Sequence, residues 1–279
     1  MNKQLIGDMV NRKTPELPKE KSELLKHHSY IGVEVELEKA LGLATNIAKD
    51  PETPWEVKGD GSLRDDGYEF VFKKPLAGKD VEQAIDQLSD AIIEHPVSST
   101  VNCSTHVHLD FTKNTLDELF NFIFTYMLVE DTLAEYCGEW RKDNLYCLTF
   151  SNAENLVTVV SNMYHDQSLK PLLRYGENML KYSALNMFTL HRFGTLEVRL
   201  AKGLSTKEDL YKWINMVYCI RKYADTVDNP MDLLVDVSRK GVNGFYEDIF
   251  EEYYEELSPF VSYENTYDAI DRIQYIISK

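Results

Sequence analysis

Acidic side chains alternate with apolar ones from Gly32 to Glu38. Successive side chains of a β-strand point to opposite faces, so Glu34, Glu36 and Glu38 would share one face, with valine and leucine on the other. At roughly 3.3 Å of rise per residue, neighbouring carboxylates would lie about 6 to 7 Å apart and repel one another. Such a row needs bulk water or cations to neutralise it, which makes it either a solvated edge or a candidate metal site.

Two histidines fall on one side of a second alternating stretch, residues 105–110. Here His106, His108 and Asp110 share a face, and Val107 points to the opposite side. A lone histidine is most often a structural ring with satisfied hydrogen bonds. Two histidines and an aspartate on one strand face instead favour cation or phosphate chemistry.

Other charged residues are expected beside these two strands. Residues 68–72 alternate as a strand that places Glu69 opposite aromatic side chains, and Asp60 lies in the turn-rich segment before it. A later strand places Glu197 and Arg199 on one face. Because arginine can hold a phosphate through two parallel N–H donors, this face would combine acids that attract cations with a donor for phosphate.

The segments between these strands have helical periodicity. Apolar residues at a period of 3.6 predict a helix over 79–94, and a capping box at Thr115–Glu118 predicts a long helix that ends near Gly138. A second capping box, Ser205–Glu208, predicts the start of another helix. The other expected elements are a strand at 55–58, a helix at 153–163, and a hairpin of Leu185–Leu190 and Thr195–Leu200 with its turn at Arg192–Gly194.

Strands with one apolar and one charged face, separated by amphipathic helices, predict an α+β fold. The sheet is expected to be curved and mainly antiparallel, with helices packed on one face and a chemically active face opposite. Residues 1–28 are predicted to form a polar N-terminal arm, and residues 29–279 a single catalytic domain with a helical C-terminal part. Residues 139–180 are expected to supply loops and helical pieces of a lid or substrate wall.

The charge balance limits the classes of partner. The chain has 30 Lys+Arg against 46 Asp+Glu, a formal net charge of −16, which opposes binding to anionic membranes. It also disfavours nucleic acid as a partner unless a local basic patch exists. No apolar run approaches the roughly 18 to 20 residues that span a bilayer, and no signal-peptide pattern is present. We therefore expect a cytoplasmic protein with small or specific partners.

Carboxylates with an occasional imidazole suit Mg²⁺ or Mn²⁺, hard cations that keep open positions for phosphate oxygens. A nucleoside triphosphate would fit such a site without a P-loop, whose Gly-x-x-x-x-Gly-Lys-Ser/Thr pattern does not occur in this sequence. The cations would neutralise the charge that develops as the γ-phosphoryl group moves.

Five short motifs occur in the order seen in the amidoligase family: Gly32–Glu36, Asp60–Ser62 followed by Glu69, His106–His108, Lys181–Asn186 and Thr195–Arg199. The chain thus resembles these carboxylate–amine ligases of the glutamine synthetase and glutamate–cysteine ligase superfamily, in a branch found in phage and bacterial genomes. The resemblance covers about residues 30–215. It implies a glutamine-synthetase-like catalytic domain that binds ATP with two or three Mg²⁺ (or Mn²⁺). It also implies an acyl phosphate, which an amine attacks to give an amide, ADP and phosphate. The substrates would be small-molecule or peptide carboxylates and amines, in the host cytoplasm if the protein is phage-encoded.

By position, the resemblance assigns roles to individual residues. Arg199 is expected to meet the transferring phosphoryl group, and His108 is a second candidate for catalysis. Lys58, Lys181 and Asn186 are candidates for phosphate or substrate contact, with local structural roles as the alternative for the last two. The implied metal ligands are Glu34, Glu36, Asp60, Glu69, His106 and Glu197.

Two other functions stay open at this point. The pattern His106-x-His108 also resembles the metal-binding His-x-His of amidohydrolases, which would make the protein a zinc hydrolase. Alternatively, the domain is a non-catalytic nucleotide-binding or interaction module. Bound zinc with hydrolysis that needs no nucleotide would favour the first alternative. Nucleotide binding without ADP production would favour the second.

Overall fold

The computed structural model describes residues 4–138, 140–141 and 144–279. The chain divides into two compact units. Unit 1 consists of residues 1–15, 110–197 and 218–279, and unit 2 of residues 16–109 and 198–217. The prediction that residues 29–279 act as a single catalytic domain stays a prediction.

The strands form a sheet with the order β2-β3-β1-β4-β6-β5. The pairs β2–β3, β1–β3 and β1–β4 are all antiparallel, and helices accompany the sheet, so the predicted α+β fold with a mainly antiparallel, curved sheet is confirmed. The strands are β1 (Ile31–Leu37), β2 (Trp55–Gly59), β3 (Tyr68–Phe72), β4 (Ser104–Asp110), β5 (Leu185–Asn186) and β6 (Thr195–Lys202).

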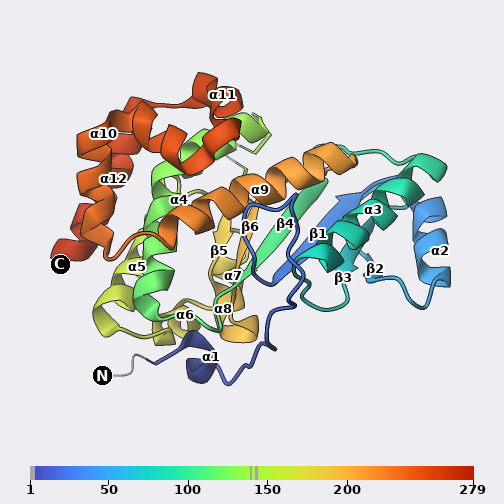
Figure 1. Ribbon diagram of the computed structural model, residues 1–279, viewed down its shortest axis with the longest axis horizontal. Helices are drawn as coiled ribbons and strands as arrows, with labels where there is room; N and C mark the ends of the chain where they lie inside the picture. Colours follow the sequence, from blue (N-terminus) through green and yellow to red (C-terminus); the bar gives the residue numbers. More distant parts are fainter. Residues whose placement is uncertain (1–3, 139, 142–143) are drawn as a thin grey trace. The chain divides into compact units, whose positions relative to one another are not determined.

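In unit 2, helix α2 (Leu41–Lys49) packs against β2 and β3, and α3 (Lys79–Glu94) lies beside α2. Val33 and Val35 of β1 are fully buried, as their alternation predicts. Trp55 on β2 donates its indole N–H to the carbonyl of Ala84 in α3, at 2.9 Å, which ties this helix to the sheet. Figure 1 shows α3 running alongside the strands of unit 2, next to α2. The helix predicted over 79–94 is confirmed.

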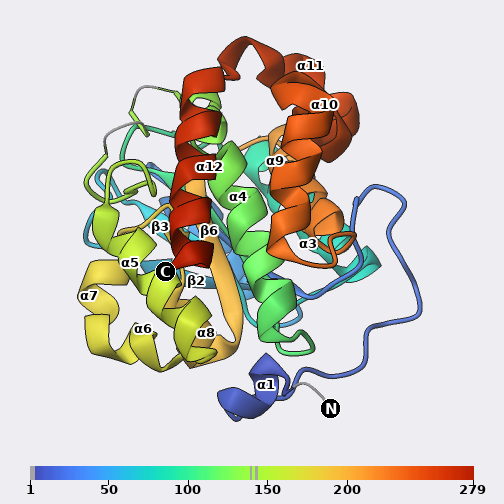
Figure 2. The ribbon, with the colours of Figure 1, turned by 90° about the vertical axis from the view of Figure 1, so that its left-hand side faces the viewer.

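Unit 1 is built around α4 (Leu116–Cys137), most of whose residues are buried. Figure 2 shows α12 lying between α5 and α10 and beside α4. A helix with most of its residues buried belongs in the interior of a helical layer, and α4 takes that place. The other helices are α1 (Ile6–Met9), α5 (Glu154–Asp166), α6 (Lys170–Tyr175), α7 (Glu177–Leu180), α8 (Phe188–Phe193), α10 (Pro230–Phe250), α11 (Tyr254–Leu257) and α12 (Tyr263–Ser278), with α9 (Lys207–Ala224) shared by both units and short 3-10 turns at Glu251–Tyr253 and Ser258–Phe260.

Several local predictions are confirmed. The capping box at the start of α4 is present, with the Thr115 hydroxyl accepting from the Glu118 N–H and the Glu118 carboxylate accepting from the Thr115 N–H. The helix predicted at 153–163 exists as α5 and continues to Asp166. Residues 139, 142 and 143 of the proposed lid segment lie outside the described residues. So do residues 1–3 of the predicted arm, whose next part forms α1 and hydrogen-bonds through Ile6 N–H to Asn114 in unit 1.

The predicted hairpin is wrong in its first arm, since residues 188–193 form helix α8 and only Leu185–Asn186 is a strand. The Asn186 side chain accepts from the Phe188 N–H at 3.0 Å, and the Thr189 hydroxyl donates to the Asn186 carbonyl at 2.9 Å. Such local side-chain bonds compete with a strand ladder and favour a turn into a helix. Gly194, at φ +75°, then ends α8 before β6 begins.

The second capping box is also displaced. Thr206, rather than Ser205, caps α9, because its hydroxyl accepts from the Asp209 N–H at 3.2 Å. Both hydroxyl residues satisfy the sequence pattern for a cap, and an acid follows each at the third position.

Among the described residues, no helix combines the length and apolarity that crossing a membrane requires.

Helix α4 buries one carboxylic acid, Glu130, which is 1% exposed. Its Oε2 accepts from the Phe150 N–H at 2.6 Å. Burial raises the pKa of Glu130 well above its usual range.

We expect this acid to destabilise unit 1 as the pH rises. A folded-state pKa above the unfolded one stabilises the fold at acid pH, and this contribution is lost as the pH rises toward the folded pKa, by at most about 1.4 kcal/mol per pH unit. Glu130→Gln keeps an acceptor for Phe150 but cannot ionise. Thermal unfolding of this variant between pH 5 and 9 should show a weaker pH dependence than wild type or the exposed control Glu255→Gln. An unchanged slope would contradict the expectation.

Candidate functional site

Three neighbouring strands of unit 2 bring acids and histidines to the sheet face opposite the buried valines. In the antiparallel register, Glu34 of β1 pairs with His106 of β4, and Glu36 pairs with Glu69 of β3. His108 follows two residues after His106 and so lies on the same face. The register thus gathers on one face residues that are far apart in the sequence.

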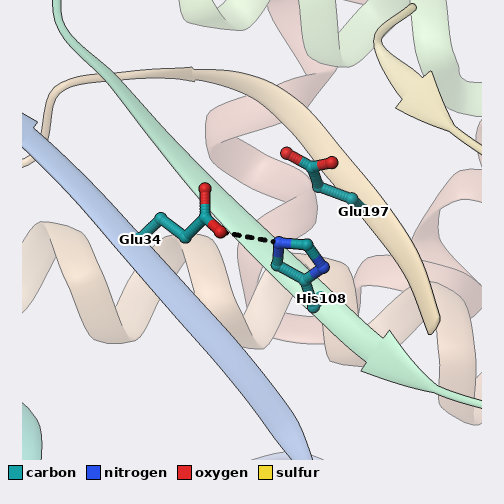
Figure 3. Close-up of side chains that lie close together, drawn as sticks. All are labelled: Glu34, His108 and Glu197. Atoms are coloured by element: carbon teal, nitrogen blue, oxygen red, sulfur yellow. Dashed lines mark hydrogen bonds and ion pairs between the residues drawn. The ribbon is translucent and has the colours of Figure 1, made fainter. Parts of the chain in front are cut away.

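Glu34 lies between the two histidines. Its Oε2 is 3.1 Å from Nδ1 of His106, and its Oε1 is 3.1 Å from Nε2 of His108. Figure 3 shows the second of these contacts, on β1 and β4, together with the side chain of Glu197 on β6. Burial would raise the pKa of Glu34, but the hydrogen bonds and charges of the two histidines outweigh it and hold that pKa well below its usual range. Glu34 is therefore ionised.

The pKa of Glu69 is shifted in the opposite direction. Burial and then the nearby negative charge of Glu34 raise the pKa of Glu69 to about 8. Lys58, its partner across the β2–β3 pair, opposes this rise through its positive charge. Two carboxylates that share a site cannot easily both be ionised, so Glu69 keeps a proton at neutral pH.

Glu34, Glu69 and His106 form a set of potential metal ligands. Each offers one ligand atom, and the three atoms all lie within 4.8 Å of one another. Two carboxylate oxygens and one imidazole nitrogen suit a divalent cation such as Mg²⁺ or Mn²⁺. Binding of a cation would replace the proton on Glu69.

Arg199 lies beside this set. Its Nη1 is 3.3 Å from Nδ1 of His106, so strand β6 brings a guanidinium to the ligand cluster within unit 2. Lys58 is exposed, and its Nζ lies 3.4 Å from Glu56 Oε2. The predicted phosphate contacts thus differ in their surroundings, because Arg199 adjoins the acids and histidines whereas Lys58 points to solvent beside an exposed acid.

Two residues predicted to be metal ligands, Glu36 and Asp60, instead accept hydrogen bonds from serines. Glu36 is 7% exposed, and its Oε2 accepts from the Ser104 N–H at 2.8 Å. Asp60 accepts from the N–H and the hydroxyl of Ser62, at 2.7 and 2.8 Å, in a local turn. Neither residue belongs to a group of potential metal ligands within the described part of the chain.

The other predicted site residues belong to unit 1. Asn186 donates its Nδ2 hydrogen to Oε2 of Glu197 at 2.6 Å, and Glu197 is buried on β6, two residues before Arg199. Lys181 places its Nζ 4.8 Å from the centre of the Tyr182 ring. Their roles as ligand or substrate contacts stay predictions.

A family model described as "Putative amidoligase enzyme" matches residues 71–220, more than half of the 279-residue chain. The chain belongs to this family. The predicted resemblance is therefore confirmed, and the amidoligase family is one of ligase-type enzymes. His106, His108 and Arg199 lie inside the matched region, whereas Glu34 and Glu69 precede it. No curated protein matches the sequence.

One residue in contact with these acids and histidines, Ser104, was not predicted from the sequence. Ser104 contacts both Glu36 and His106, and it begins β4 two residues before His106. The alternation that grouped His106 with His108 extends to Ser104, so the signal was present in the sequence. The predicted strand began one residue too late to include it.

The raised pKa of Glu69 gives the metal-free amidoligase a specific pH dependence. Since the folded pKa is above the unfolded one, the stability that Glu69 contributes is present below its ordinary pKa of 4.5 and is lost as the pH rises through about 8. The depressed pKa of Glu34 acts only at lower pH. Glu69→Gln should therefore flatten thermal stability between pH 5 and 8 in EDTA, relative to wild type and the exposed control Glu56→Gln. Equal slopes in all three proteins would contradict this assignment.

Proposed function

We propose that this amidoligase is an ATP- and Mg²⁺-dependent carboxylate–amine ligase. The observation that carries the proposal is the ligand set of Glu34, Glu69 and His106 on one sheet face, with the Arg199 guanidinium beside His106. The acids and the imidazole suit a divalent cation, and the guanidinium suits a phosphate oxygen. Membership of a ligase-type family supports the same reading.

The reaction would proceed in two steps. The γ-phosphoryl group of ATP moves to a carboxylate oxygen of the acid substrate, giving an acyl phosphate and ADP. The amine then attacks the acyl carbon, the amide C–N bond forms, and inorganic phosphate leaves with the former carboxylate oxygen while the amine loses a proton. Small-molecule or peptide acids and amines would fill the two substrate roles.

This chain's own residues would bind and orient the reactants. A bound divalent cation would supply charge neutralisation for the phosphates. Glu34 would hold the cation, with His108 keeping the carboxylate in place through its contact at 3.1 Å. Arg199 would donate hydrogen bonds to the transferring phosphoryl group, which gains charge as it moves. Glu197 is proposed as a further ligand, and Lys58, Lys181 and Asn186 as phosphate or substrate contacts.

Calorimetric titration of ATP, with Mg²⁺ and separately with EDTA, tests the proposal. Wild-type protein should bind ATP only with the cation. Glu34→Ala and Glu197→Ala should each weaken this binding at least tenfold, which is about 1.4 kcal/mol, because each removes a proposed ligand. Glu94→Ala, which changes an exposed acid at the end of α3, should bind like wild type.

Binding that is equal with and without Mg²⁺, or that survives both ligand substitutions, would refute the metal-bridged nucleotide site. The two histidines that contact Glu34 also keep a zinc hydrolase as the rival function. Stoichiometric zinc, with amide hydrolysis in the absence of nucleotide, would replace our proposal by that one. Nucleotide binding with no ADP formed over a broad panel of acids and amines would favour a non-catalytic binding module.

A further inference from the structure

Ser104 stands at the centre of a buried hydrogen-bonded chain in unit 2. It is 5% exposed, and its Oγ lies 2.7 Å from Nε2 of His106. Both its backbone N–H, at 2.8 Å, and its hydroxyl contact the same oxygen, Oε2 of Glu36. A single serine therefore joins a carboxylate of β1 to an imidazole of β4.

The donor and acceptor properties of these groups determine which atom donates in each hydrogen bond. A carboxylate only accepts hydrogen bonds, so the single hydroxyl proton of Ser104 is donated to Glu36. The serine oxygen must then accept from His106, which places a proton on Nε2 of the ring. In the neutral imidazole this leaves Nδ1 without a proton and with its lone pair available.

Nδ1 is the nitrogen that faces the ligand cluster. It lies 3.1 Å from Glu34 Oε2 and 3.3 Å from Nη1 of Arg199. One ring nitrogen cannot both donate to Glu34 and accept from Arg199, so its proton decides between them. When the ring carries protons on both nitrogens, Nδ1–H donates to Glu34, which is the contact that lowers the pKa of Glu34. When the ring is neutral, the proton stays on Nε2, and the proton-free Nδ1 can accept from Arg199 or coordinate a cation held by Glu34 and Glu69.

We propose that Ser104, anchored by Glu36, is a positioning residue that fixes the ring orientation and tautomer of His106 so that Nδ1 is ready to bind a divalent cation. Metal-ligating histidines generally donate their second ring N–H to an acceptor of the protein. Here that acceptor is a serine backed by a carboxylate. The proposal rests on the metal site of the proposed function, and it gives Glu36 the role of anchor in place of the ligand role expected from the sequence.

Metal affinity without nucleotide gives the first test, with Mn²⁺ titrated into the purified protein. Ser104→Ala should bind Mn²⁺ 10- to 100-fold more weakly than wild type, the loss typical for removal of such a supporting group. Ser104→Thr keeps the hydroxyl and should recover most of the affinity. Ser89→Ala is the matched control, because Ser89 is a buried serine of α3 whose hydroxyl has no hydrogen-bond partner among the described residues. Wild-type affinity in Ser104→Ala would overturn the proposal.

A double variant tests whether Glu36 and Ser104 affect Mn²⁺ affinity through the same series of hydrogen bonds. If Glu36 serves only to anchor Ser104, Glu36→Gln combined with Ser104→Ala should bind Mn²⁺ no more weakly than the weaker single variant. If Glu36 is itself a metal ligand, the fold-losses of Mn²⁺ affinity in the two single variants should multiply in the double variant. Multiplied losses would overturn the anchor role.

The tautomer of His106 supplies a readout that needs no cation, nucleotide or substrate. Nitrogen-15 NMR of the metal-free protein, at a pH where the ring is neutral, should show the proton on Nε2 in wild type and in Ser104→Thr. Ser104→Ala should shift the population toward the Nδ1-protonated form. A wild-type ring protonated on Nδ1, or no change in Ser104→Ala, would overturn the proposal. This experiment decides the role of Ser104 even if the ligase proposal fails the ATP titration.

Discussion

Repulsion between carboxylates that share one half-buried sheet face is the constraint on which the site depends. Strands β1 and β3 place Glu34, Glu36 and Glu69 close together, where water screens them poorly. Each of the three carboxylates is stabilised in a different way. Two histidines contact Glu34, Ser104 binds Glu36, and Glu69 keeps a proton, since its pKa is raised to about 8. In the proposed metal site, a divalent cation would take the place of the proton on Glu69.

The opposite face of the same strands supplies the stability that such a site requires. Val33, Val35 and Leu37 alternate with the acids and are fully buried. Burying each such side chain contributes about 1.5–3 kcal/mol. The same alternation that creates the charged face thus buries the opposite face in the core. A slip of one residue in the register would exchange the two faces, so the core holds the acids in place.

The sequence allows the strand faces to be predicted, but not which strands are neighbours. Alternation over Gly32–Glu38 and residues 105–110 is a local property, and both strands are present, as β1 (Ile31–Leu37) and β4 (Ser104–Asp110). The pairing of Glu34 with His106 depends on packing between distant segments, which no local pattern records. The failure at residues 188–193 has a similar cause, because two side-chain hydrogen bonds at Asn186 and Thr189 turn an apparent strand into α8. Ser104 was left out because the predicted strand began one residue after it, although the alternation extends to Ser104.

The family match and the site geometry support the ligase proposal from different parts of the chain. The match begins at residue 71, after Glu34 and Glu69, so it gives no information on those acids. It includes His106 and Arg199, whose atoms lie against each other at 3.3 Å. Glu34 and Glu69 lie near His106 because β1 pairs with both β3 and β4. His106 is therefore the residue at which the two lines of support meet, and in our proposal its hydrogen bond with Ser104 holds its ring for the cation.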